Sequence, residues 1–125
     1  MILIVDDTPE NLISLKRVLE KHDFEVDTAS SGEEALKKVL RNAYVLIILD
    51  VQMPGMDGYE LARRLRSQPG MTNTTLIATT GYGDEQGRKE AFAAGFDHHF
   101  TKPIDIERLF ALLAEISAAN CQLVA

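Results

Sequence analysis

Apolar residues follow two different patterns along the 125-residue chain. Short runs such as 44–50 are almost continuously apolar, whereas longer segments carry apolar residues three or four positions apart. The first pattern is typical of strands buried in a sheet, and the second is typical of amphipathic helices. We expect five strands, at residues 2–6, 24–29, 44–50, 75–80 and 97–102. We expect a helix after each strand, at residues 8–22, 31–42, 57–68, 84–95 and 105–119.

Three of the predicted helices begin at residues that commonly cap a helix. Thr8 precedes Pro9, whose missing N–H costs nothing in the first turn. Ser31 and Asp57 each have a glutamate three residues later, which is the spacing of a capping box. The second helix is expected to bury three apolar residues, Leu36, Val39 and Leu40.

Strands that alternate with helices predict an α/β fold, with a parallel sheet covered by helices on both faces. Right-handed crossovers leave few topologies. The common doubly wound order for five strands, numbered along the chain, is the flavodoxin-like order 2-1-3-4-5. The length suits a single domain, which we place at residues 1–119, followed by a C-terminal tail at 120–125.

Composition and charge argue against several classes of function. The net charge of -6 is unlike that of a nucleic-acid-binding domain, and it disfavours docking on an anionic membrane. No apolar run approaches the ~20 residues that span a bilayer. The single cysteine, Cys121, cannot form an internal disulfide. We therefore expect a cytoplasmic protein.

Three carboxylates are predicted to meet at one edge of the sheet. Asp6 ends the first strand and Asp7 follows it, and Asp50 ends the third. In the predicted order these strands are neighbours, and ligands bind at the carboxyl ends of such strands. The acids would repel one another, whereas a hard divalent cation with oxygen ligands removes this conflict. We therefore expect Mg²⁺ here, with Mn²⁺ as a substitute.

Two further strand ends carry groups suited to phosphate. Thr80 supplies a hydroxyl at the end of the fourth strand, and Gly81 lets a backbone approach closely. Lys102 supplies an ammonium group at the end of the fifth strand. Acids for a metal, a hydroxyl and an ammonium at one edge are typical of phosphoryl transfer.

Four short motifs lie at these strand ends: "VDD" at 5–7, "LDVQMPGMDG" at 49–58, "TTG" at 79–81 and "TKP" at 101–103. In order and spacing they resemble the receiver domain of two-component response regulators, the family that includes the chemotaxis regulators. The resemblance covers residues 1–118. A chemotaxis receiver is itself a standard example of the strand order predicted above.

The resemblance implies a role for each acid. Asp50 would be the phosphoacceptor and would take a phosphoryl group from a phosphohistidine of a sensor kinase or of a histidine phosphotransfer protein. Asp7 would ligate Mg²⁺ directly, and Asp6 would act mainly through metal-bound water. The backbone carbonyl of Gln52 would be a further ligand. Such a domain catalyses only its own phosphorylation and dephosphorylation, so it is not an enzyme acting on other substrates.

The resemblance also implies how the signal is passed on. Lys102 would contact a phosphoryl oxygen, and its bond to Pro103 would be cis. Thr80 would reorient toward the phosphoryl group and change the surface of the fourth helix, fifth strand and fifth helix. An aromatic switch residue is usual three positions before the lysine, but this chain has His99 there. His99 is either an exposed residue of an edge strand, which we favour, or a switch.

Gln52 and Tyr82 are expected to tune the lifetime of the phosphoryl group. Gln52 lies two residues after Asp50, and Tyr82 lies two residues after Thr80. Both side chains could cover the site and limit attack by water. Tyr82 is equally well explained as an exposed loop residue.

Two other classes of function fit part of the sequence. A small Mg²⁺-dependent phosphatase working through an aspartyl phosphate needs a general acid two residues after its nucleophile, where this chain has Gln52. A flavodoxin-like cofactor binder needs a Ser-, Thr- or Gly-rich loop after the first strand. This chain has "DDTPEN" at 6–11, whose acids would repel a phosphate.

The output of the signal stays open at this stage. The chain could be a stand-alone receiver, a relay intermediate, or part of a hybrid histidine kinase. The run "TTGYG" at 79–83 is typical of receivers in hybrid kinases. The downstream effector is unknown.

Overall fold

A computed structural model describes residues 1–52, 57–71, 73–81, 85–102 and 104–124. In this part of the chain, strands and helices alternate without exception. The strands are β1 (Ile2–Val5), β2 (Val26–Ala29), β3 (Leu46–Asp50), β4 (Thr75–Thr80) and β5 (His98–Thr101). The helices are α1 (Pro9–Glu20), α2 (Gly32–Val39), α3 (Gly58–Arg66), α4 (Glu85–Ala94) and α5 (Ile106–Val124).

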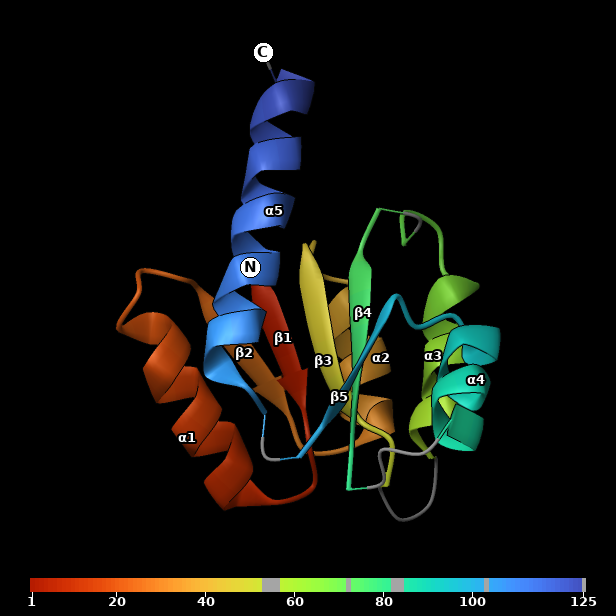
Figure 1. Ribbon diagram of the computed structural model, residues 1–125. Helices are drawn as coiled ribbons and strands as arrows, with labels where there is room; N and C mark the ends of the chain where they lie inside the picture. Colours follow the sequence, from red (N-terminus) through yellow and green to blue (C-terminus); the bar gives the residue numbers. More distant parts are fainter. Residues whose placement is uncertain (53–56, 72, 82–84, 103, 125) are drawn as a thin grey trace.

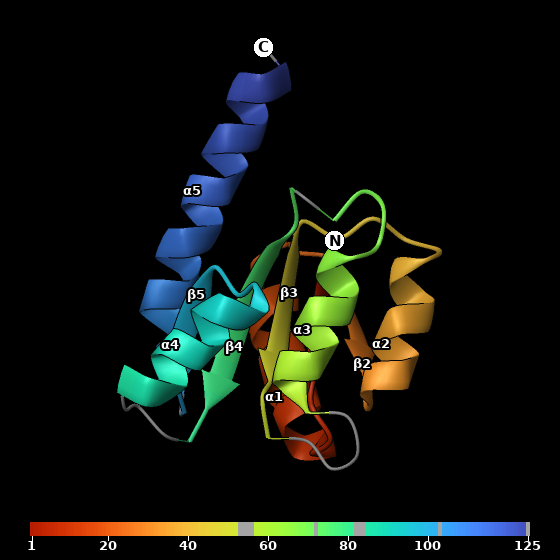
Figure 2. The ribbon, with the colours of Figure 1, turned by 90° about the vertical axis from the view of Figure 1, so that its right-hand side faces the viewer.

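The strands form one parallel sheet in the order β2-β1-β3-β4-β5, which confirms the predicted doubly wound topology. Helices α1 and α5 cover one face, and α2, α3 and α4 cover the other (Figures 1 and 2). The register pairs Ile2 with Leu46 and Val5 with Leu49, so Asp6, which follows β1, comes level with Asp50 at the end of β3.

Alternation along each strand divides the buried side chains between two cores. In β1, Leu3 and Val5 point to the α2–α4 face, whereas Ile2 and Ile4 point to the α1–α5 face. Leu61 and Leu65 of α3 complete the first core. The second core is completed by residues of α1 and α5, namely Leu12, Leu19, Leu109 and Leu113. Because both faces are covered, every residue of β1 and β3 is buried.

Two of the three predicted helix caps are present. The Ser31 hydroxyl accepts a hydrogen bond from the N–H of Glu34 at 3.2 Å, and the Asp57 carboxylate accepts one from the N–H of Glu60 at 2.8 Å. Thr8 occupies the cap position of α1, but its side chain makes no capping bond. The prediction for Thr8 was therefore right in position and wrong in chemistry.

Two expectations about helices differ from the structure. Helix α5 continues to Val124, beyond the end expected at residue 119 (Figure 1). Leu40, expected to be buried, is 71% exposed. It lies five residues after the buried Ala35, about 140° around the helix, and so faces away from the core. None of the helices among the described residues combines the length and apolarity that crossing a membrane requires.

Arg66 ties together the edge of the sheet at which the strands begin. Its guanidinium group donates hydrogen bonds to the carbonyls of Gly95, Met71 and Thr74 at 2.9, 2.8 and 2.7 Å. It also pairs with the carboxylate of Asp97. One side chain of α3 thereby holds the segments that lead into β4 and β5.

Asp27 of β2 joins three elements through its carboxylate. Lys38 of α2 donates to Oδ1 at 2.8 Å, and the hydroxyl of Tyr44, just before β3, donates to Oδ2 at 2.8 Å. Burial alone raises the pKa of Asp27, but the hydrogen bonds from Lys38, Tyr44 and the N–H of Thr28 outweigh it and hold the pKa below its usual range. Burial and the bond to Asp27 raise the pKa of Tyr44 to about 12.

The substitution Asp27→Asn should lower the free energy of unfolding by about 1 kcal/mol at neutral pH, because it weakens hydrogen bonds to a partly exposed charge. The folded-state pKa of Asp27 lies below its ordinary value of 3.8. The stabilisation is therefore present above pH 3.8 and is lost as the pH falls through the lower folded-state pKa. Urea unfolding of both proteins over this range measures the effect. A difference that stayed constant from neutral to strongly acidic pH would contradict it.

Candidate functional site

The carboxyl ends of the strands bring polar residues together at one edge of the sheet. Asp6 and Asp7 follow β1, and Asp50 is the last residue of β3. Thr80 is the last residue of β4, and Lys102 follows β5. The structure thus gathers the five residues that sequence analysis assigned to strand ends.

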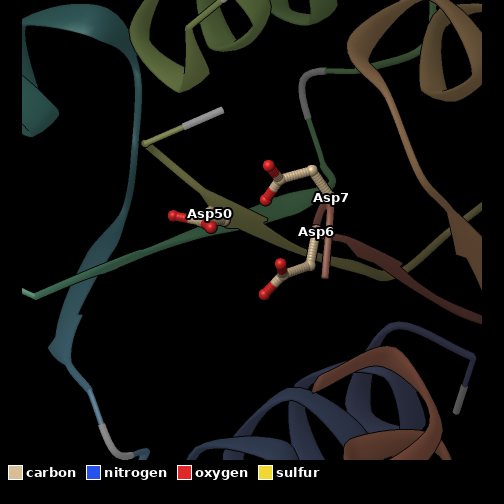
Figure 3. A group of neighbouring side chains, drawn as sticks. All are labelled: Asp6, Asp7 and Asp50. Atoms are coloured by element: carbon tan, nitrogen blue, oxygen red, sulfur yellow. The ribbon is translucent and has the colours of Figure 1, made fainter. Parts of the chain in front are cut away.

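The three carboxylates lie close enough to share a cation. Asp6, Asp7 and Asp50 each offer an oxygen within 4.8 Å of the others. Figure 3 shows Asp50 extending from β3 beside the two acids that follow β1. Asp6 and Asp50 are only 6% and 3% exposed, whereas Asp7 is exposed. Two buried negative charges therefore sit next to a third that faces solvent.

Lys102 supplies positive charge to this group. Its Nζ lies 3.0 Å from Oδ2 of Asp50 and 3.7 Å from Oδ2 of Asp6. The backbone N–H of Lys102 donates to the carbonyl of Thr80 at 2.7 Å, which fixes the start of its side chain. A buried carboxylate is costly unless it is paired and hydrogen-bonded, so Lys102 is the main counter-charge for Asp50.

Backbone and side-chain donors complete the surroundings of the two buried acids. Oδ1 of Asp50 accepts from the N–H of Gln52 at 2.9 Å. Oδ1 of Asp6 accepts from the N–H of Thr8 at 2.9 Å, and Oδ2 of Asp6 accepts from Nδ2 of Asn11 at 3.2 Å. Asp6 is therefore held by protein donors on both oxygens.

The donor set fits a hard divalent cation. Three carboxylates face one ammonium group, so the cluster carries excess negative charge. Mg²⁺ prefers oxygen ligands and usually takes one or two carboxylates together with water. Both oxygens of Asp6 accept hydrogen bonds, and the two oxygens of Asp50 contact the N–H of Gln52 and Nζ of Lys102. Asp7, which faces solvent, is therefore the most accessible direct ligand. The residues present thus suit Mg²⁺.

Adjacent threonines at the end of β4 have different surroundings. The Thr79 hydroxyl donates to the carbonyl of Leu49 at 3.1 Å and so binds to the neighbouring strand. Thr79 is level with Asp50 in the register, and Thr80 lies one residue further toward the edge. Both threonines are 3% exposed.

Gly58 holds the start of α3 tightly against the end of β3. A Cβ atom built on Gly58 would lie 2.4 Å from Cα of Val51 and 2.9 Å from the carbonyl oxygen of Asp50. Both contacts are with backbone, which cannot move without displacing Asp50. The N–H of Gly58 also donates to the carbonyl of Val51 at 3.2 Å. Only glycine fits this approach.

His99 is not the exposed edge residue that we favoured from the sequence. It is 9% exposed, although β5 is an edge strand. Its neighbour Phe100 packs in the α1–α5 core, so alternation turns His99 to the opposite face, where α4 lies (Figure 2). Both faces of β5 are covered by helices, and this covering buries His99.

The other residues that the sequence predicts to tune the site are Gln52 and Tyr82. Gln52 is exposed, and its side-chain oxygen would lie 3.6 Å from a Cβ atom built on Gly81. Tyr82 and Pro103, including the predicted cis bond, lie outside the described residues. Sequence analysis missed Asn11, for which the available signal was its place in the first turn of the helix that follows Asp6.

Comparisons with known proteins agree with this geometry. The family model described as the response regulator receiver domain matches residues 2–114. The transcriptional regulatory protein ResD of Bacillus subtilis is 38% identical over 123 residues, which cover 95% of this chain and 50% of that protein. The chain therefore spans about half the length of this curated relative.

Solved structures share the fold over nearly the whole chain. The chemotaxis response regulator CheY4 of Vibrio cholerae has a TM-score of 0.85 and 30% identity, with 92% of this chain and 96% of that chain covered. The receiver domain of a signal transduction histidine kinase from Syntrophus aciditrophicus has a TM-score of 0.84 and 32% identity, with 94% and 89% covered.

Proposed function

The chain belongs to the family of response regulator receiver domains, and from this premise we propose that it is a phosphoacceptor in a two-component phosphorelay. Asp50 accepts a phosphoryl group from a phosphohistidine of a sensor kinase or histidine phosphotransfer protein in the cytoplasm. The observation that carries the proposal is the position of Asp50. Its carboxylate is 3% exposed, lies 3.0 Å from Nζ of Lys102 and shares the strand ends with two further acids.

The chemistry follows from these neighbours. An oxygen of Asp50 attacks the phosphorus, a P–O bond forms, and the P–N bond of the phosphohistidine breaks with its electron pair returning to the imidazole nitrogen. Nζ of Lys102 lies beside Oδ2 of Asp50, where it can offset negative charge on the incoming phosphoryl group. The backbone bond from Gln52 to Oδ1 of Asp50 orients the carboxylate, so that Oδ2 faces Lys102.

A divalent cation is expected to assist. Asp7, Asp50 and the backbone carbonyl of Gln52 would hold Mg²⁺ or Mn²⁺, with Asp6 acting through water. When bound, the metal supplies positive charge against the acids and the phosphoryl oxygens. Thr80 would then donate its hydroxyl to the phosphoryl group and convey its presence to the face of α4, β5 and α5.

The alternative is a small phosphatase that turns over an external substrate through the same aspartate. That activity needs a general acid close to the nucleophile. The place two residues after Asp50 holds Gln52, which has no proton to give as an acid. The receiver function, limited to the domain's own phosphorylation and dephosphorylation, is therefore the better supported.

Incubation with acetyl phosphate and Mg²⁺ should add one phosphoryl group to the parent protein, measured as intact mass after rapid quenching. Asp50→Asn should abolish the adduct, because the amide is a poor nucleophile. Asp23→Asn is the matched control, since Asp23 is exposed and its φ of 66° suits asparagine equally well. Adduct formation by Asp50→Asn would refute the proposed acceptor, and adduct formation by the parent without any divalent cation would refute the role of the metal.

The side chain of Gln52 should lengthen the life of the phosphoryl group by covering it against water. Gln52→Ala should therefore raise the rate of dephosphorylation by a few-fold, followed as loss of the mass adduct after acetyl phosphate is removed. Gln68→Ala, two residues beyond the end of α3, serves as the control. Equal lifetimes in all three proteins would mean that Gln52 gives no protection. Tyr82 is proposed to act in the same way.

The buried position of His99 supports a role in passing on the signal. Its side chain would have to reorient when α4 and β5 respond to the phosphoryl group. His99→Ala should weaken the chemical-shift changes that beryllium fluoride causes along α4 and β5, while the phosphorylation rate stays near that of the parent. His98→Ala is the neighbouring control. Chemical-shift changes in His99→Ala as large as those in the parent would exclude a switch role.

A further inference from the structure

Two buried carboxylates compete for one ammonium group at the site. Lys102 Nζ lies 3.0 Å from Asp50 but 3.7 Å from Asp6, so the ion pair is unequal. Both acids are nearly inaccessible to water, at 3% and 6% exposure. The ammonium group of Lys102 would be attracted equally by two carboxylates of the same charge, so charge alone does not explain why it lies closer to Asp50. Something else must satisfy Asp6.

Asp6 is bound by neutral hydrogen-bond donors, so it can do without a close contact with Lys102. The N–H of Thr8 binds Oδ1 at 2.9 Å, and Nδ2 of Asn11 binds Oδ2 at 3.2 Å. The second bond is made to the same oxygen that Lys102 approaches at 3.7 Å. Only the NH₂ group of the Asn11 amide can face a carboxylate favourably, so this residue acts as a donor.

We propose that Asn11 is a positioning residue: its amide donates a hydrogen bond to Asp6, so that Lys102 can pair with Asp50. The inference rests on the proposed function, since it states which donor serves which carboxylate of the phosphoacceptor site. Asn11 comes from the first turn of α1, and its own N–H is bound to the carbonyl of Thr8 at 3.1 Å. Its amide is thus presented to Asp6 from a fixed backbone.

Two consequences follow if the amide is removed. Oδ2 of Asp6 loses its donor, and among the described residues Lys102, at 3.7 Å, is the cationic side chain placed to replace it. The ammonium group moves toward Asp6, and Asp50 loses part of its counter-charge. Asp6 would also lose a contact that orients its carboxylate beside a bound cation. Partners that orient metal ligands in this way typically affect metal affinity by about tenfold or more.

The test compares Asn11→Leu with the parent in two measurements. Leucine has a similar size and a higher helix propensity at this exposed position, so α1 should still form. Calorimetric titration with Mg²⁺ alone should give a dissociation constant raised about tenfold. A crystal structure without metal should show Nζ of Lys102 about 3 Å from Asp6 rather than Asp50.

Two further variants separate donation from packing. Asn11→Gln keeps the amide and should bind Mg²⁺ more tightly than Asn11→Leu. Asn42→Leu removes another exposed asparagine amide, which donates to the carbonyl of Lys38 at 3.4 Å, and should leave Mg²⁺ affinity unchanged. Unchanged affinity in Asn11→Leu with Lys102 still on Asp50, or equal losses in Asn11→Leu and Asn11→Gln, would overturn the inference.

Failure of the proposed function would look different. In that case the parent protein itself would take up neither Mg²⁺ nor a phosphoryl group. The metal-free crystal structure of Asn11→Leu would still report whether Lys102 changes its partner. The placement of Lys102 therefore tests Asn11 independently of the reaction.

Discussion

Repulsion between the three carboxylates at one edge of the sheet is the constraint on which the rest of the site depends. The parallel register of β1 and β3 brings Asp6 level with Asp50, and both acids have almost no contact with water. Such an arrangement is stable only if each oxygen has a donor or a cation nearby. Lys102, Asn11 and two backbone N–H groups meet part of that demand, and a divalent cation would meet the remainder.

The two cores hold this unfavourable edge in place. A slip of one residue in β3 would send Asp50 to the opposite face and exchange the apolar side chains of β3 between the two cores. The acids therefore lie at the ends of two strands that are buried along their whole length. The opposite edge is secured differently, by the hydrogen bonds of Arg66 to three carbonyls and by its ion pair with Asp97.

Much of the fold and the site can be read from the sequence, because both depend on local signals. The apolar runs predict strands whose ends then supply the acids, the threonine and the lysine. What escapes prediction are contacts between residues far apart in the chain or turned by the geometry of a helix. Leu40 is exposed because of its angle around α2, and His99 is buried because α4 covers an edge strand. The bond from Asn11 to Asp6 depends on where α1 starts, and Tyr44 reaches Asp27 across 17 positions.

The close approach at Gly58 makes the nucleophile and a helix move together. The first turn of α3 lies directly on the backbone of Asp50 and Val51, with no side chain between them to absorb a shift. A shift of the Asp50 backbone toward α3 would therefore have to move the first turn of α3 with it. The same contact limits evolutionary drift, since a larger residue at position 58 would have to be matched by a new path for the end of β3.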